Sequence, residues 1–173
     1  MSYLYVLAAV LLRLLPHPWN ATPLAAMFLF SGATFRGRRE SLLVPLAALL
    51  ISDYAAGQLL WHGRYPWFSA SKCIAFLLIA LIGWTLRNRM SFAKIAGASL
   101  AGSVIFFLIT NFAVWLAGSL YPRTAAGLVA CYLAGLPFFQ NTLLGDLAYA
   151  GVMFGSYHCI AQRRWTPARQ AAN

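Results

Sequence analysis

Residues 95–118, IAGASLAGSVIFFLITNFAVWLAG, make up most of the longest stretch without a charged residue in this chain. That stretch lies between Lys94 and Arg123. At a rise of about 1.5 Å per residue, these 24 residues make a helix roughly 36 Å long, enough to cross a hydrocarbon core of about 30 Å. The stretch therefore predicts a membrane-spanning helix, with Asn111 as its most polar member.

The composition of the whole chain favours the same class of protein. The chain is 61% hydrophobic and 9% charged, whereas average soluble domains carry about 25% charged residues. Its formal net charge of +10 does not indicate a nucleic-acid partner, because nucleic-acid binders gather their basic residues on one solvated face. Here the basic residues fall between apolar runs. We therefore expect a single membrane domain over residues 1–173, with the lipid bilayer as a partner and without nucleic acid.

Turn and charge signals divide the chain into six apolar runs, which predict an all-α bundle of six helices. Their approximate ranges are 2–15, 21–35, 41–57, 70–87, 95–118 and 141–162. The first two are shorter than the ~20 residues of a perpendicular span, so they need support from neighbouring helices or a locally thinner bilayer. Residues 124–139 form an extra apolar piece, expected to be a re-entrant or interfacial segment that Pro137 ends.

The positions of the basic residues predict the orientation in the membrane. Nine of the thirteen lie at one end of the expected helices: Arg36, Arg38, Arg39, Arg87, Arg89, Lys94, Arg163, Arg164 and Arg169. Because cytoplasmic loops are enriched in Lys and Arg, this end is expected to face the cytoplasm, with both termini inside. A full span at residues 124–139 would move the basic C-terminus outside, which argues against one.

Two of the three acidic residues of the chain, Asp53 and Asp146, stand inside apolar runs. Charged residues within membrane helices are costly and usually face a cavity or a partner. Asp53 lies roughly 18 Å up its expected helix and Asn111 about 24 Å up, while Asp146 lies about 7 Å below the expected outer start of the last helix. All three are therefore expected at one depth in the outer half of the membrane. Glu40, in a basic cluster, is expected to be an ordinary surface charge.

The outward loops add further polar and aromatic side chains to this outer layer. The sequence thus predicts a ligand pocket lined by His17, Asn20, Asp53, Tyr65, Cys73, Asn111, Arg123, Asn141 and Asp146.

Several of these residues have a simpler interpretation as well. The two aspartates could each pair with a basic residue and only hold the bundle together, because buried carboxylates are normally paired. The candidate partners are Arg13, Arg64 and Arg123. Asn111 could simply hydrogen-bond across the bundle. His17, between two prolines, could be an ordinary loop histidine rather than a ligand.

Cys73 is the cysteine for which the sequence leaves three interpretations open. It is a small buried hydrophobe, a soft metal ligand, or one half of a disulfide with Cys131. Lys72 beside it favours the thiolate, the form that binds metals. The three cysteines include no CxxC or Cys/His metal spacing, and nucleotide-loop and hydrolase motifs are absent, so no intrinsic cofactor is expected.

Five segments together resemble a family of small, largely uncharacterised transport proteins. They are RLLPHPWNATPLAA at 13–26, PLAALLISD at 45–53, FFLITNFAVW at 106–115, Tyr121-Pro122, and GLPFFQNTLLGD at 135–146. That family is similar to the substrate-binding S components of energy-coupling-factor (ECF) vitamin transporters. The resemblance implies six helices, an outer ligand pocket built partly by loops, a bacterial cytoplasmic membrane, and an ECF-type energising module as a partner.

Within the S-component-like proteins, solitary cobalamin-uptake proteins of the BtuM type use a cysteine as an axial ligand to the corrin cobalt. The resemblance therefore implies cobalamin as the specific substrate and Cys73 as the cobalt ligand. Two other classes of function stay open. In the first, an intramembrane aspartyl enzyme, Asp53 and Asp146 would share a proton. In the second, a structural membrane subunit, the outer polar groups would be fully paired and no pocket would open.

Overall fold

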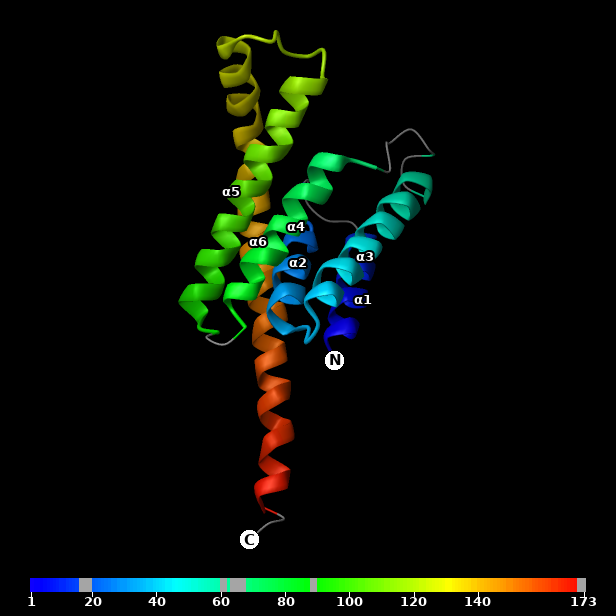
Figure 1. Cartoon of the computed structure of the whole chain (residues 1–173), viewed down its shortest axis with the longest axis vertical. Coiled ribbons are helices and arrows are strands. Elements are labelled where there is room, and N and C mark those ends of the chain that lie inside the picture. The colour runs from blue at the N-terminus through cyan, green and yellow to red at the C-terminus, as the bar shows by residue number, and fades with distance from the viewer. Residues whose placement is uncertain (16–19, 60–61, 63–67, 88–89, 171–173) are drawn as a thin grey trace.

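The computed structural model describes residues 1–15, 20–59, 62, 68–87 and 90–170, with only the backbone of 59 and 161–170. Within these residues the chain forms six α-helices and no strand (Figure 1). They are α1 (Ser2–Arg13), α2 (Leu24–Thr34), α3 (Arg38–Leu59), α4 (Ala70–Thr85), α5 (Phe92–Ala117) and α6 (Ala125–Gln170). The prediction of an all-α fold is confirmed.

Three helices are long and apolar enough to cross a membrane. These are α3 over Arg38–Gln58, α5 over its whole length, and α6 over Ala125–Ile160. The other three described helices are apolar but have only 11 to 16 residues. Each of the six predicted apolar runs coincides with a helix, with boundaries shifted by a few residues for the first five.

The predicted break before the last helix is wrong. Residues 124–139 do not form a separate re-entrant segment, because α6 runs without interruption through Pro137. A proline removes one backbone hydrogen bond, and in an apolar bundle neighbouring helices hold the chain helical across that gap. Here α6 packs along α5, where Tyr132 donates a hydrogen bond to the carbonyl of Leu108 and Cys131 contacts the carbonyl of Asn111.

The short helix α2 is the centre of the bundle. Residues Leu24 to Ala33 are all buried, and α2 contacts each of the five other helices. A helix that is hydrophobic on every face has no preferred side for water or lipid, so it is stable only when surrounded. This explains how an apolar helix of only 11 residues is stable in this fold.

Two glycines bring α2 and α4 into backbone contact. A Cβ atom on Gly32 would lie 2.1 Å from the carbonyl oxygen of Ala80, and one on Gly83 would lie 2.3 Å from that of Leu29. Only glycine allows this separation, as at small-residue contacts between membrane helices.

A cluster of two arginines and a tryptophan closes the end of the bundle where α2 ends. Arg38 and Arg87 both lie over the ring of Trp84, at 5.3 Å and 5.7 Å from its centroid. Arg87 also donates a 2.8 Å hydrogen bond to the carbonyl of Gly32, and the Trp84 indole donates to the hydroxyl of Ser41. These contacts satisfy a carbonyl in the last turn of α2 with a cation, which suits the helix dipole.

The hairpin of α5 and α6 projects beyond the other helices at the opposite end, and α6 projects again below the bundle (Figure 1). At the tip of the hairpin the Trp115 indole donates a 3.1 Å hydrogen bond to the carbonyl of Pro122. Gly127 lies so close to this carbonyl that a Cβ atom there would be 2.0 Å from it. The hairpin therefore turns tightly at its top.

Candidate functional site

Asp53 is held by two cations from two other helices. Its side chain is 2% exposed and forms salt bridges with Arg13 at the end of α1 and with Lys72 in the first turn of α4. The Lys72 ammonium lies 2.8 Å from Oδ2 of Asp53, and Arg13 also donates a 2.6 Å hydrogen bond to Ser52. The structure therefore pairs Asp53 with Arg13, one of the expected partners, and with Lys72, which was not an expected partner.

Asp146 has a different environment. It lies on α6, is 2% exposed, and its Oδ2 atom is 2.6 Å from the hydroxyl oxygen of Ser103 on α5. Among the described residues no basic side chain forms an ion pair with it. The two aspartates thus have separate partners, and both oxygens of Asp53 are used by cations. They do not form the proton-sharing pair that the aspartyl-enzyme alternative requires.

The expected common depth of the polar residues is also wrong. Gly135, and not Asp146, packs on Asn111: a Cβ atom on this glycine would lie 2.6 Å from Oδ1 of Asn111. Asp146 follows eleven residues later, roughly 16 Å further along the helix, at the level of Ser103. The error came from the start of α6, which begins at Ala125 and not near 141.

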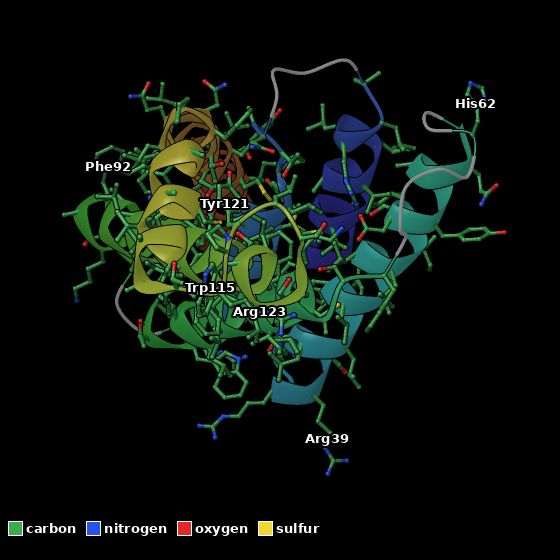
Figure 2. All side chains as sticks on the ribbon, turned by 90° about the horizontal axis from the view of Figure 1, so that it is seen from above. Arg39, His62, Phe92, Trp115, Tyr121 and Arg123 are labelled. Carbon is green, nitrogen blue, oxygen red and sulfur yellow. The ribbon has the colours of Figure 1, made fainter. Side chains whose placement is uncertain are left out.

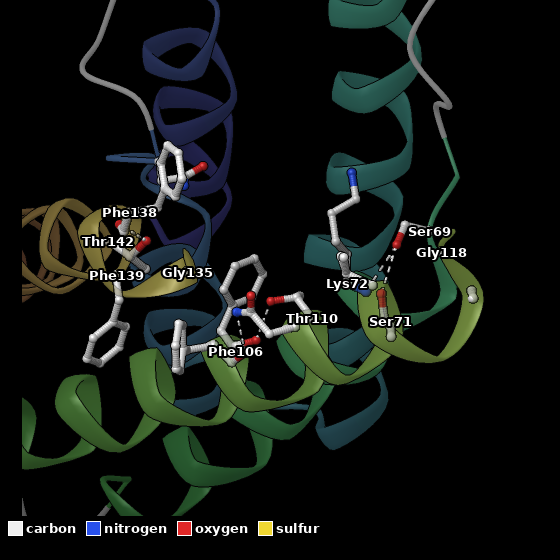
Figure 3. Close-up of a pocket in the computed structure, with 16 residues that line it drawn as sticks. Ser69, Ser71, Lys72, Phe106, Thr110, Gly118, Gly135, Phe138, Phe139 and Thr142 are labelled. Carbon is white, nitrogen blue, oxygen red and sulfur yellow. Dashed lines mark hydrogen bonds between the residues drawn. The ribbon is translucent and has the colours of Figure 1, made fainter. Parts of the chain in front are cut away.

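A cavity of about 660 Å³ lies beside the Asp53 cluster, between the start of α4, the C-terminal half of α5 and α6 (Figure 3). Its lining is formed by Asn20, Ser69, Ser71, Lys72, Phe106, Phe107, Thr110, Asn111, Ala113, Val114, Ala117, Gly118, Gly135, Phe138, Phe139 and Thr142.

Phenylalanines and short polar side chains alternate along the two long helices that line the cavity. Thr110 donates to the carbonyl of Phe106 at 2.7 Å, Asn111 to that of Phe107 at 2.8 Å, and Thr142 to that of Phe138 at 3.1 Å. The hydroxyl hydrogens of Thr110 and Thr142 and one N–H of Asn111 are used one turn back within their own helices. The oxygen atom of each side chain still has lone pairs available for a ligand.

The start of α4 contributes the most polar part of the lining. Ser69 is the N-cap of α4, and its hydroxyl lies 3.5 Å from the backbone nitrogen of Lys72 and 3.0 Å from the hydroxyl of Ser71. Figure 3 shows these three residues together on one side of the cavity, with Phe138 and Phe139 on the other. A helix N-terminus carries unpaired N–H groups and a partial positive charge, so this side is the more favourable one for negative groups.

The segment before α2 approaches from the side of α6. Asn20 has a positive φ of 64°, a conformation that asparagine adopts more readily than most residues. The next residue, Ala21, is close enough to α6 that a Cβ atom on Gly145 would lie 2.9 Å from its Cα. This contact places Asn20 beside the turn of α6 that carries Thr142, another lining residue.

Of the residues predicted for the site, the structure brings Asn20 and Asn111 to the cavity, with Asp53 behind Lys72. Arg123 and Asn141 are exposed and are not among the described lining residues. Asp146 is buried away from it, against Ser103. The predictions for His17 and Tyr65 fall outside the described residues.

Sequence reasoning missed most of the lining, including Thr110, Thr142 and the four phenylalanines. A usable signal was present, because Phe107 and Asn111, like Phe138 and Thr142, are four residues apart and so share a helix face. It could not be used for the second pair, because Phe138 was expected in the segment 124–139 and Thr142 in a separate helix over 141–162.

The cysteines are free, so the alternative of a Cys73–Cys131 disulfide is wrong. Cys131 is buried, and its sulfur lies 3.4 Å from the carbonyl oxygen of Asn111. Cys73 is half-buried and packs partly against the apolar core. Within the described part of the chain no three side chains of His, Cys, Asp or Glu gather as a metal site would require.

The fold and the cavity define a helical bundle with three helices able to cross a membrane and a pocket between its longest helices and α4. Residues 1–169 match a family described as a family of unknown function (DUF6580), and the chain therefore belongs to this family. No curated protein and no solved structure matches it.

Proposed function

We propose that this protein is an integral membrane protein that captures a small solute in the cavity between α4, α5 and α6 and takes it up into the cell. The observation that carries the proposal is the cavity itself. Its volume of about 660 Å³ lies within the ~300–1,000 Å³ of small-molecule sites, and its apolar walls with a few convergent polar groups are typical of such sites.

The distribution of charge supports an outward-facing cavity. The arginine-rich end of the bundle, with Arg38 and Arg87 on Trp84, lies at the far end of α4 from Ser69 and Lys72. Under the positive-inside rule that end faces the cytoplasm, so the cavity opens toward the outside. In this orientation α6, which continues through Pro137 as one helix, would carry the basic C-terminus to the cytoplasmic side.

The resemblance to ECF S components supplies the proposed mechanism. Such a protein binds its solute in the outer half of the membrane and releases it inside, and an ECF-type energising module supplies the energy. Six helices in the described residues and the lack of a nucleotide-binding motif in the chain agree with that division of labour. A bacterial cytoplasmic membrane is the location that this mechanism requires.

Cobalamin is the specific substrate that we propose to test first. Cys73 directly follows Lys72, which lines the cavity, and its thiol is free and half-buried. Coordination of the corrin cobalt requires this thiol to turn from the core toward the cavity. The solute-capture proposal does not depend on this step, since the cavity exists without Cys73 in its lining.

The deciding experiment is to identify the molecule that copurifies with the protein. We expect mass spectrometry of protein from cells grown in rich medium to detect a bound small molecule, which Asn111→Leu and Thr142→Val reduce. Absence of any such molecule, together with no difference in solute uptake between intact cells with and without the protein, would refute solute capture.

The cobalamin version has its own readout. Protein from cells grown with cobalamin should show a corrin absorption band that Cys73→Ala abolishes. Cys159→Ala is the matched control, because Cys159 is exposed on the distal part of α6. A colourless wild-type protein excludes cobalamin and leaves the wider proposal standing.

A further inference from the structure

The charge beside the cavity does not balance. Asp53 is bound by two cations, Arg13 and Lys72, so the three side chains together carry a net charge of +1. The chain contains only two other acidic residues. Asp146 is buried against Ser103. Glu40, in the first turn of α3, accepts a 3.4 Å hydrogen bond from Tyr3. No other carboxylate side chain of this protein can therefore neutralise the second cation.

The unbalanced charge lies where solvent screening is weak. The side chains of Arg13, Lys72 and Asp53 are 14%, 17% and 2% exposed. Charge interactions strengthen as the effective dielectric constant falls, and an excess charge removed from water is costly. An anion placed near these cations would be stabilised for the same reason.

The position of Lys72 connects this excess charge to the cavity. Lys72 belongs both to the Asp53 cluster and to the cavity lining, and it lies in the first turn of α4. The N-cap Ser69 and the hydroxyl of Ser71 lie on the same side of the cavity. Positive charge, a helix N-terminus and two hydroxyl groups thus converge on this side.

The remaining walls are apolar and aromatic. They include Phe106 and Phe107 from α5 and Phe138 and Phe139 from α6. The ring centroids of Phe107 and Phe139 are 4.8 Å apart. Among the described lining residues Lys72 is the only charged one. A ligand that matches both the polar side at the start of α4 and the apolar walls needs one negative charge at one end and an apolar body at the other.

We propose that the cavity selects a singly charged organic carboxylate with an apolar or aromatic body. The carboxylate lies at the start of α4, near Lys72, Ser69 and Ser71, while the body lies against the phenylalanines that line the rest of the cavity. Asn111 and Thr142 accept hydrogen bonds from a polar substituent of that body. This inference rests on the proposed capture of a small solute and names its chemical class. Cobalamin carries amides and no carboxylate, so it lies outside this class, and the carboxylate and cobalamin are alternative substrates.

The test compares ligands that differ only in charge. Purified wild-type protein in lipid nanodiscs is titrated with 3-phenylpropionate, 4-phenylbutyrate and indole-3-propionate, each beside its primary amide. Binding is measured by calorimetry and by the shift of the thermal unfolding temperature. We expect each carboxylate to bind at least about tenfold more tightly than its amide, the factor that about 1.4 kcal/mol of charge-assisted hydrogen bonding supplies.

A matched pair of variants tests the assigned cation. Lys72→Met leaves Asp53 with Arg13 alone, a neutral pair, so the variant should fold while its carboxylate-to-amide preference falls to about one. Lys94→Met makes the same substitution at an exposed position near the opposite end of α5 and should keep the preference. Selectivity in the wild-type protein is itself a test that does not depend on how well Lys72→Met folds.

The outcomes distinguish a failure of the carboxylate inference from a failure of the proposed solute capture. If amides bind as tightly as carboxylates, or if no member of the series binds, the inference is overturned. Solute capture would still stand if wild-type protein retained a copurified neutral molecule. A preference that Lys72→Met leaves intact also overturns the assignment.

Discussion

The contact between Ser103 and Asp146 contains more acceptors than protons if Asp146 is ionised. The Ser103 hydroxyl lies 3.1 Å from the carbonyl oxygen of Ser99 and 2.6 Å from Asp146, and it has a single hydrogen. A protonated Asp146 resolves the contact, because the acid then donates to Ser103 and Ser103 donates to Ser99. Burial without a cation favours the same neutral form.

We therefore expect Asp146→Asn to fold nearly as well as the wild-type protein, since an amide can also donate to Ser103. Ser103→Ala removes the acceptor and should cost about 1 kcal/mol of unfolding free energy. Infrared difference spectra at mildly acidic pH should show a carboxylic-acid C=O band that Asp146→Asn removes. Absence of this band in the wild-type protein would mean that Asp146 is ionised.

Asp53 should behave in the opposite way, because its charge is required. Asp53→Asn leaves Arg13 and Lys72 side by side without a counter-charge, and breaking a buried ion pair typically costs about 3–5 kcal/mol. Denaturant unfolding in detergent measures the loss, and solute uptake should fall with it. Glu40→Gln is the control, expected within about 0.5 kcal/mol of wild type because Glu40 is exposed. Equal stability of the two variants would refute the role of the cluster.

At the scale of helices, the sequence predicted which segments are helical better than where they begin. Apolar runs between charges located all six helices, since each run must bury its surface. The continuity of α6 was not predictable from local rules, because Pro137 is a helix breaker in isolation and α5 packing overrides it. That single error displaced Asp146 in depth and hid Phe138 and Thr142 from the predicted site.

The α2–α4 contact offers a test of packing with a built-in control. Gly83→Ala places a methyl group 2.3 Å from the carbonyl oxygen of Leu29, where backbone must move, so we expect a loss of about 2 kcal/mol or more. Gly97→Ala adds the same methyl group where no atom lies within 4 Å, and should stabilise α5 by up to about 1 kcal/mol. Thermal unfolding in nanodiscs compares the two. A Gly83→Ala protein as stable as Gly97→Ala would refute the close backbone contact.

At the scale of the whole molecule, the two ends of the bundle are chemically different. One end is closed by Arg38 and Arg87 on Trp84, and the other holds the cavity and the Asp53 cluster. The sequence predicted this asymmetry, because it follows from the order of charges along alternating helices. The residues that form the cavity walls could not be predicted from the sequence, because they depend on how α4, α5 and α6 pack against one another.

This asymmetry makes the membrane orientation a decisive test for the function. We expect an Arg123→Cys protein without the native cysteines to react with a membrane-impermeant maleimide in intact cells. Arg39→Cys should react only after the membrane is opened. Both side chains are exposed, and Figure 2 shows Arg39 projecting from the periphery of the bundle, so accessibility within the protein does not limit either reaction. The reverse labelling pattern would place the cavity on the cytoplasmic side, where it could not collect a solute from outside the cell. That result would refute solute uptake and favour a protein that binds a solute from within the cell.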